Sequence, residues 1–172
     1  MYSIDDLGTF VSLRPSSNSL DELEALQAAM QLPNPVPRDS IHCTVVDSAK
    51  TMRGYTAWGE IWPCIHSTPV GLAKWPWLDN RECVVLLLDS EDIILRNQRL
   101  CDIYKVPPAK YPFVPHITLA YGTENDDIRL LPPSVLQLAI QRVSFVKEYS
   151  IACCSEVRDH ILKNLNTDNL PL

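Results

Sequence analysis

No apolar run in this sequence is long enough to cross a membrane. The longest, Cys83–Leu88, has the length of one strand, whereas a membrane-spanning helix needs about 20 residues. The first residues, MYSIDD, carry no basic stretch followed by an apolar one, so they do not indicate a secretory signal peptide. We therefore expect a cytoplasmic protein with no membrane partner.

The six cysteines show no C-x-x-C spacing. A chain of 172 residues with 46% hydrophobic residues can bury a core without covalent cross-links. Cys43 and Cys83 lie in apolar segments, where a free thiol packs as a small hydrophobic side chain. We therefore expect reduced cysteines. Cys43 directly follows His42, but neighbouring residues of a strand point to opposite faces, which argues against a Cys–His nucleophile.

Basic clusters are also missing. The 15 lysines and arginines are scattered and are outnumbered by 21 acidic residues, which gives a formal net charge of −6. Proteins that follow a DNA or RNA strand usually present a basic face. The charge therefore predicts no long nucleic-acid partner, and a phosphate ester that binds here would be a small molecule in a pocket.

One short pattern occurs twice. The segment IHCTVV contains His42 and Thr44, and the segment PHITLA contains His116 and Thr118. Their β-branched and apolar content predicts two strands. Since alternate side chains of a strand share a face, each strand presents an imidazole and a hydroxyl together, backed by a hydrophobic face. Two such strands side by side would hold a phosphate between a base and an acid.

The predicted elements follow the same order in both halves of the chain: strand, helix, proline-rich connector, His-x-Thr strand. The two histidines are 116 − 42 = 74 positions apart, close to half the chain. This order predicts an α+β fold with an internal duplication and two pseudo-symmetric lobes in one domain over residues 1–172. We expect the tail after about residue 165 to be flexible. The other predicted elements are strands over 7–13, 82–88 and 143–154, two helices with Ser19 and Ser90 as their N-caps, and a short helical run to Ile140 that Pro133 and Ser134 precede.

The paired histidines suggest acid–base chemistry. Because imidazole has a pKa near ~6.5, one ring can be neutral and accept a proton while the other is charged and donates one. In a ribonucleotide linkage the natural nucleophile is the adjacent 2′-hydroxyl, and its attack leaves a 2′,3′-cyclic phosphate. Thr44 and Thr118 would donate hydrogen bonds to the nonbridging oxygens. His and Thr form a poor ligand set without a third or fourth ligand, so we expect no metal and no cofactor. The sequence leaves open which histidine is the base.

Aromatic residues supply candidates for contact with a nucleobase, because base–aromatic stacking tolerates any base. Trp75 and Trp77 are one residue apart, so in an extended segment they share a face and could form one wall of a base slot. Packing in the core or at a sheet edge is an equal alternative for both. Phe10 in the first strand and Tyr121 after the second motif are further candidates.

Paired His-x-Thr motifs half a domain apart make the chain similar to the 2H phosphoesterase superfamily, over about residues 5–155. Its members include RNA 2′,3′-cyclic phosphodiesterases and the two-His exonuclease of U6 RNA processing. Within the superfamily the chain most resembles the phage anti-CBASS proteins. That narrower resemblance depends on Trp75-Pro76-Trp77, on PHITL and on the late strand with Glu148-Tyr149.

The resemblance implies lobes of antiparallel sheet with outer helices around a central cleft. It implies that His42, Thr44, His116 and Thr118 are catalytic, and that Glu148, with Trp75 and Trp77, helps to hold the ligand. Phage anti-CBASS proteins cleave cyclic di- and trinucleotide signals of bacterial immunity, so the implied activity is a phosphodiesterase in the host cytoplasm.

Two alternatives remain. The same chemistry could act on 2′,3′-cyclic phosphates or RNA ends, or the protein could be a sponge that binds a cyclic nucleotide without cleaving it. The intact motifs argue against the sponge, since binding alone does not require two proton-transfer groups. The acidic charge and the tryptophan pair favour a small ligand over RNA. The sequence predicts no oligomeric state.

Overall fold

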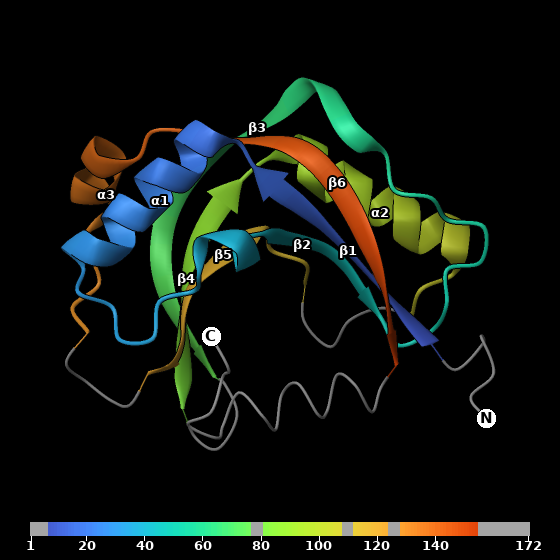
Figure 1. The fold of residues 1–172 in the computed structure, drawn as a ribbon, viewed down its shortest axis with the longest axis horizontal. Coiled ribbons are helices and arrows are strands. Elements are labelled where there is room, and N and C mark those ends of the chain that lie inside the picture. The colour runs from blue at the N-terminus through green and yellow to red at the C-terminus, as the bar shows by residue number, and fades with distance from the viewer. Residues whose placement is uncertain (1–6, 77–80, 108–111, 124–127, 155–172) are drawn as a thin grey trace.

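The computed structural model describes residues 7–76, 81–107, 112–123 and 128–154. Its elements in chain order are β1 (Leu7–Pro15), α1 (Ser17–Ala29), the 3₁₀ helix η2 (Arg38–Ser40), β2 (Cys43–Ser48), β3 (Gly59–Pro76), β4 (Glu82–Asp89), α2 (Glu91–Tyr104), β5 (His116–Thr123), α3 (Pro133–Ala139) and β6 (Val143–Cys154) (Figure 1). Trp77 and the tail after residue 165 lie outside the described residues.

The strands of the described residues pair antiparallel and close into a barrel in the order β1-β2-β5-β4-β3-β6. This order divides into two groups, β6-β1-β2 and β3-β4-β5. In each group the central strand, β1 or β4, is followed along the chain by a helix and then by a His-x-Thr strand. The α+β fold and the two pseudo-symmetric lobes predicted from the sequence are confirmed. The two groups meet where β2 pairs with β5 and where β3 pairs with β6.

A row of apolar side chains crosses four neighbouring strands and decides which residues face the core. Leu13 of β1 pairs with Cys43 of β2. Cys43 pairs with Ile117 of β5, which pairs with Leu86 of β4. All four residues are 0% exposed. Because full burial of one large aliphatic side chain contributes roughly 1.5–3 kcal/mol, a one-residue slip that turned this row to solvent is strongly disfavoured.

The helices pack crosswise on the two motif strands. α1, from the first half of the chain, contacts β5, while α2, from the second half, contacts β2. Figure 1 shows α1 and α3 together on one side of the sheet and α2 on the other. Among the described residues, no helix combines the length and the apolar character that a membrane span requires.

The start of α1 corrects a prediction. The helix begins at Ser17, and Ser16 is its N-cap, whose Oγ accepts the N–H of Ser19 at 3.3 Å. Ser19, the predicted cap, instead lies buried in the first turn, where its Oγ accepts the N–H of Ser144 from β6. Three serines with similar capping propensity lie close together here, and the contact with β6 decides between them.

The start of α2 was predicted at the correct place, but for a partly different reason. Ser90 occupies the N-cap position, yet its side chain makes no capping bond. Its hydroxyl donates instead to the carbonyl of His66 on β3, at 3.1 Å. The acidic residues Glu91 and Asp92 in the first turn remain favourable at this helix end.

β3 was not predicted as a strand, because prolines and glycines interrupt its pattern. The strand changes partner along its length: residues up to Ser67 pair with β6, and residues from Thr68 pair with β4. Pro63 and Pro69 lie where the register of these two ladders shifts, a position at which a missing N–H is tolerated. The second part of β3 carries Trp75 to the motif strands.

Candidate active site

The pairing of β2 with β5 brings the two motifs together. Cys43 lies opposite Ile117 in an antiparallel pair. One residue to either side, the register places His42 opposite Thr118 and Thr44 opposite His116. Opposite residues share a face, with Cβ atoms about 4.5–5.5 Å apart. All four side chains therefore leave one face of the β2–β5 pair, which we call the motif face, and all four are partly exposed.

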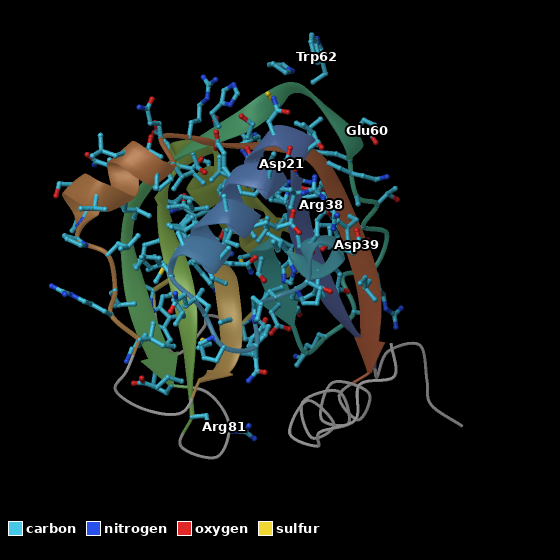
Figure 2. All side chains as sticks on the ribbon, turned by 60° about the vertical axis from the view of Figure 1, so that its left-hand side comes forward. Asp21, Arg38, Asp39, Glu60, Trp62 and Arg81 are labelled. Carbon is cyan, nitrogen blue, oxygen red and sulfur yellow. The ribbon has the colours of Figure 1, made fainter. Side chains whose placement is uncertain are left out.

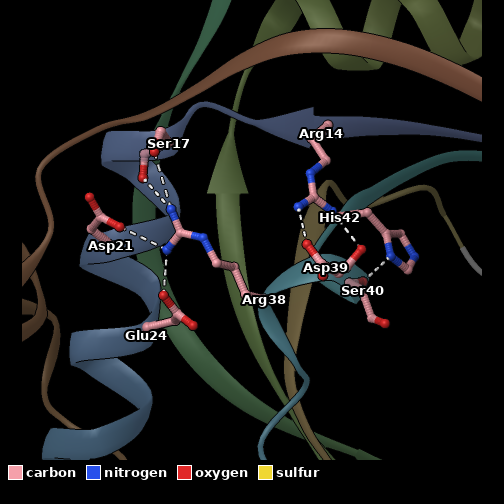
Figure 3. Close-up of polar contacts among 8 residues, drawn as sticks. All are labelled: Arg14, Ser17, Asp21, Glu24, Arg38, Asp39, Ser40 and His42. Carbon is pink, nitrogen blue, oxygen red and sulfur yellow. Dashed lines mark hydrogen bonds and ion pairs between the residues drawn. The ribbon is translucent and has the colours of Figure 1, made fainter.

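Both imidazoles are held in the same orientation. The Nδ1–H of His42 donates to the Ser40 carbonyl oxygen at 2.6 Å (Figure 3), and the Nδ1–H of His116 donates to the Val114 carbonyl oxygen at 2.9 Å. A carbonyl oxygen only accepts, so Nδ1 carries the hydrogen in each ring. In the neutral form of each histidine, Nε2 is therefore the nitrogen that can accept a proton.

An aromatic ring lies against each histidine. Phe10 of β1 makes an edge contact with His42, with ring centroids 5.4 Å apart. Trp75 of β3 lies against His116, with centroids 4.4 Å apart. The structure thus brings Phe10 and Trp75, two of the residues predicted to contact a base, directly to the candidate catalytic side chains.

A β-bulge follows each His-x-Thr motif. In β2, Thr44 pairs with Ser12 and Val46 with Val11, so Val45 is an extra residue without a partner on β1. The extra residue reverses the alternation of faces beyond it. Asp47, which pairs with Phe10, is therefore turned to the motif face.

The same bulge recurs in β5. Thr118 pairs with Val85 and Ala120 with Val84, so Leu119 is the extra residue. Tyr121 is thereby turned to the motif face, where a hydrogen bond joins its side chain to Thr118. Regular alternation would have placed Tyr121 on the opposite face, so the bulge brings this predicted candidate to the site.

Charged residues clamp the turn before His42 (Figure 3). Arg38 binds the first turns of α1 through Ser17, Asp21 and Glu24. On the other side, Arg14 of β1 donates to the Asp39 side chain at 3.2 Å and to its carbonyl oxygen. The two clamps hold the turn that carries the Ser40 carbonyl, and with it the orientation of the imidazole.

Arg14 is a site residue that the sequence reasoning missed. Continuing the β1–β2 register by one residue places it beside His42, and its positive charge acts on that ring. The signal was available, because Phe10 and Arg14 lie four residues apart in one strand and therefore share a face. Arg14 thus places a cation beside His42.

The environment of both histidines favours the neutral imidazole. Burial lowers the pKa of His42 below the ordinary 6.5, against the hydrogen bond to Ser40, which raises it; the charge of Arg14 lowers it further. Burial likewise lowers the pKa of His116, with an additional contribution from His42. The two rings are thus electrostatically coupled, as expected for a pair on one face.

Glu148 lies away from the motif face. It pairs with Leu13, so it belongs to the core face of the sheet, and it is 1% exposed. Arg96 donates two hydrogen bonds to its carboxylate, at 2.8 and 2.9 Å; the Tyr55 hydroxyl and the Trp58 N–H donate to it as well. The predicted contact between Glu148 and a base edge finds no support here, because these four donors already occupy both carboxylate oxygens.

The thiol of Cys43, which follows His42 in the chain, shows no sign of nucleophilic activation. Burial raises the pKa of the Cys43 thiol to about 12, and its side chain faces the core row, away from the histidines. Among the cysteines with described side chains, Cys43, Cys64, Cys83 and Cys101 are free thiols. Over the same described residues, no group of three or more His, Cys, Asp or Glu gathers as a metal-ligand set.

Two surface cavities of about 690 Å³ each lie elsewhere on the described part of the chain. One cavity lies between α1 and α3 and has a mostly polar lining. The other lies between β3 and α2, where Arg96 stacks on Trp58 at 3.5 Å. Trp62, 95% exposed, belongs to its lining and projects from the molecule (Figure 2). None of the four motif residues lines either cavity.

The fold is that of the 2H phosphoesterases. The apo structure of E. coli LigT matches with a TM-score of 0.61 over 86% of this chain and 88% of LigT, at 15% identity. The structure of E. coli LigT complexed with phosphate matches with a TM-score of 0.57 over 86% and 87% of the two chains, also at 15% identity. At this identity the likeness establishes the fold.

Comparison with sequence relatives assigns the chain to a family within this fold. The profile of the family described as "Anti-CBASS protein Acb1" matches residues 7–150. The Acb1 protein of Enterobacteria phage T4 is 34% identical over 120 residues, which covers 67% of this chain and 72% of the relative. The Acb1 protein of Salmonella phage S16 is 32% identical over 118 residues, with the same coverage. The chain belongs to the Acb1 family of anti-CBASS proteins.

Proposed function

We propose that this protein is a metal-independent phosphodiesterase that cleaves the 3′–5′ bonds of cyclic di- or trinucleotide immune signals and thereby counteracts CBASS in the host cell. One observation carries the proposal. Both histidines use Nδ1 for a backbone carbonyl and keep Nε2 for a ligand, on a face that each shares with the threonine of the other motif. The family assignment supplies the class of ligand.

The first step is attack by the ribose 2′-hydroxyl on the adjacent phosphorus. The neutral imidazole of His42 accepts the hydroxyl proton at Nε2. The neighbouring Arg14 cation keeps His42 neutral before this step, because it disfavours a second positive charge. The imidazolium of His116 donates its Nε2 proton to the departing 5′-oxygen. The P–O2′ bond forms and the P–O5′ bond breaks, which leaves a 2′,3′-cyclic phosphate end.

Thr44 and Thr118 donate hydrogen bonds to the nonbridging oxygens, where negative charge gathers in the transition state. Arg14 adds a positive charge on the His42 side. Phe10 and Trp75, each already against a histidine, form the surfaces on which bases stack, and Tyr121 lies next to Thr118. With the roles of the two histidines exchanged, water opens the cyclic phosphate to a phosphomonoester. Trp77, whose position is not described, remains a proposed wall of the base slot.

A substrate panel in excess EDTA tests the proposal. We expect cleavage of a cyclic dinucleotide or trinucleotide, with the products separated by chromatography. The matching 2′-deoxy analogue, which lacks the nucleophile, should not be cleaved. Cleavage of 2′,3′-cyclic-phosphate RNA ends alone would indicate that the protein processes RNA ends instead. Tight binding without products would make the protein a sponge, and loss of turnover in EDTA would contradict the metal-free mechanism.

The pH dependence of kcat/KM should be bell-shaped with its maximum on the acid side of about pH 6.5. That parameter reports the free enzyme, in which the pKa of both histidines lies below the ordinary value, so the singly protonated pair is most populated there. The kcat profile should lie at higher pH, because a bound phosphate stabilises the imidazolium. Initial rates from pH 4.5 to 9 measure both profiles. A flat profile would contradict a coupled acid–base pair.

A further inference from the structure

Two amide side chains bind the two bulges in the same way. Asn97 of α2 donates from Nδ2 to the Val45 carbonyl at 2.6 Å. Gln27 of α1 donates from Nε2 to the Leu119 carbonyl at 2.8 Å. Val45 and Leu119 are the extra residues of the bulges, and each is the first residue after a motif threonine.

The extra residue of a bulge is unpaired in the strand ladder, and both Val45 and Leu119 are 0% exposed. A buried carbonyl without a donor is unfavourable, so a donor from outside the ladder stabilises such a bulge. The Val45 carbonyl accepts the Asn97 amide, and the Leu119 carbonyl accepts both the Gln27 amide and, at 2.8 Å, the backbone N–H of Val36. Gln27 is itself buried, and its Nε2 donates to two carbonyl oxygens, those of Leu119 and Val36.

The two bonds cross the halves of the molecule. Asn97, from the second half of the chain, holds the strand of the first motif, and Gln27, from the first half, holds the strand of the second. Each helix therefore ties its own half to the opposite histidine strand. The geometry of the motif face then depends on both helices together.

We propose that Gln27 and Asn97 are positioning residues for the reaction of the motif face. The proposal depends on the phosphodiesterase function proposed above. By holding the bulge carbonyls, the two amides set the position of Thr44 and Thr118 against the nonbridging oxygens, and they keep Asp47 and Tyr121 turned to the motif face. Neither amide touches the substrate. A displacement of about 1 Å at such a site can reduce the rate ~10²-fold.

The test uses near-isosteric substitutions that remove the donors. Asn97→Leu and Gln27→Met should each lower kcat by about 10–100-fold with little change in KM, because orientation in the transition state is lost rather than ligand contact. The matched controls make the same two substitutions at exposed positions, Asn18→Leu on α1 and Gln98→Met on α2, and should leave kcat unchanged. If the first variants do not fold, Asn97→Ser and Gln27→Ser leave room for a bridging water and serve in their place.

Double-mutant cycles separate positioning from a general loss of stability. Asn97→Leu should be non-additive with Thr44→Val and additive with Thr118→Val, whereas Gln27→Met should show the reverse. Equal coupling to both threonines, or equal losses in the controls, would overturn the proposal.

The NMR signals of the histidine rings provide a readout that needs no activity. Asn97→Leu should shift the ring signals of His42 more than those of His116, and Gln27→Met should do the opposite. An inactive wild-type protein would reject the phosphodiesterase function. Ring signals that fail to respond in this crossed manner would reject the positioning role.

Discussion

Replacement of His42 or His116 by alanine is expected to lower the single-turnover rate by about 10²–10⁴-fold, because each removes one proton-transfer group. The affinity for the uncleavable 2′-deoxy ligand should change little, since stacking on Phe10 and Trp75 remains. The double variant should be scarcely slower than the single variants, because both groups act in one step.

His66→Ala is the matched control for these variants. His66 is exposed on β3, its Nδ1 bonds the Ser144 hydroxyl, and it belongs to neither motif. We expect it to retain the wild-type rate. Near-normal turnover by either motif variant would contradict the acid–base pair, and a loss of ligand affinity equal to the loss of rate would show that the histidines serve mainly to bind.

Replacement of Glu148 by alanine is expected to cost about 3–5 kcal/mol in the free energy of unfolding, measured in urea. The substitution leaves the Arg96 guanidinium, whose side chain is 11% exposed, without its ionic partner. Glu60→Ala is the control: the Glu60 side chain is 79% exposed and lies 3.6 Å from Lys147, and such surface pairs contribute about 0–1 kcal/mol. A stable Glu148→Ala variant with a raised KM would instead support the ligand-binding role that the resemblance implied.

The contribution of Glu148 to stability should also depend on pH. Burial raises the pKa of this carboxyl, but the hydrogen bonds from Arg96, Tyr55 and the Trp58 N–H outweigh burial and hold the pKa below the ordinary 4.5. The folded protein therefore favours the carboxylate. Its contribution is complete above about pH 4.5 and is lost as the pH falls further. The difference in stability between the wild type and Glu148→Ala should narrow in acid.

Most elements of the fold were predictable because their signals are local. The alternating run of β1, the continuous apolar run of β4, the last strand β6 and the helices α2 and α3 appear at the predicted places. Where local signals compete, the prediction failed. Neighbouring serines left the start of α1 ambiguous, and the prolines of β3 concealed a strand that is built only by its two partners.

The candidate site likewise has features that the sequence predicts and features that it does not. The residue types and the two-residue spacing of His42 with Thr44, and of His116 with Thr118, follow from the sequence. The bulges do not, because an extra residue in a strand is decided by its pairing partners. Tyr121 reaches the motif face only through such a bulge. Arg14 carries a periodic signal that was overlooked, whereas Gln27 and Asn97 carry none, since each acts on a strand far along the chain.

Side-chain chemistry and strand alternation, both readable over a few residues, were enough to indicate two histidine–threonine pairs and the reaction class that such pairs suit. Long-range pairing decided how the two histidine–threonine pairs lie relative to each other, through the pairing of β2 with β5 and the crossed bonds from α1 and α2. It also decided the burial of Glu148 against Arg96. The physical reason is that hydrogen bonds and burial between distant segments depend on register and packing, which no single segment encodes.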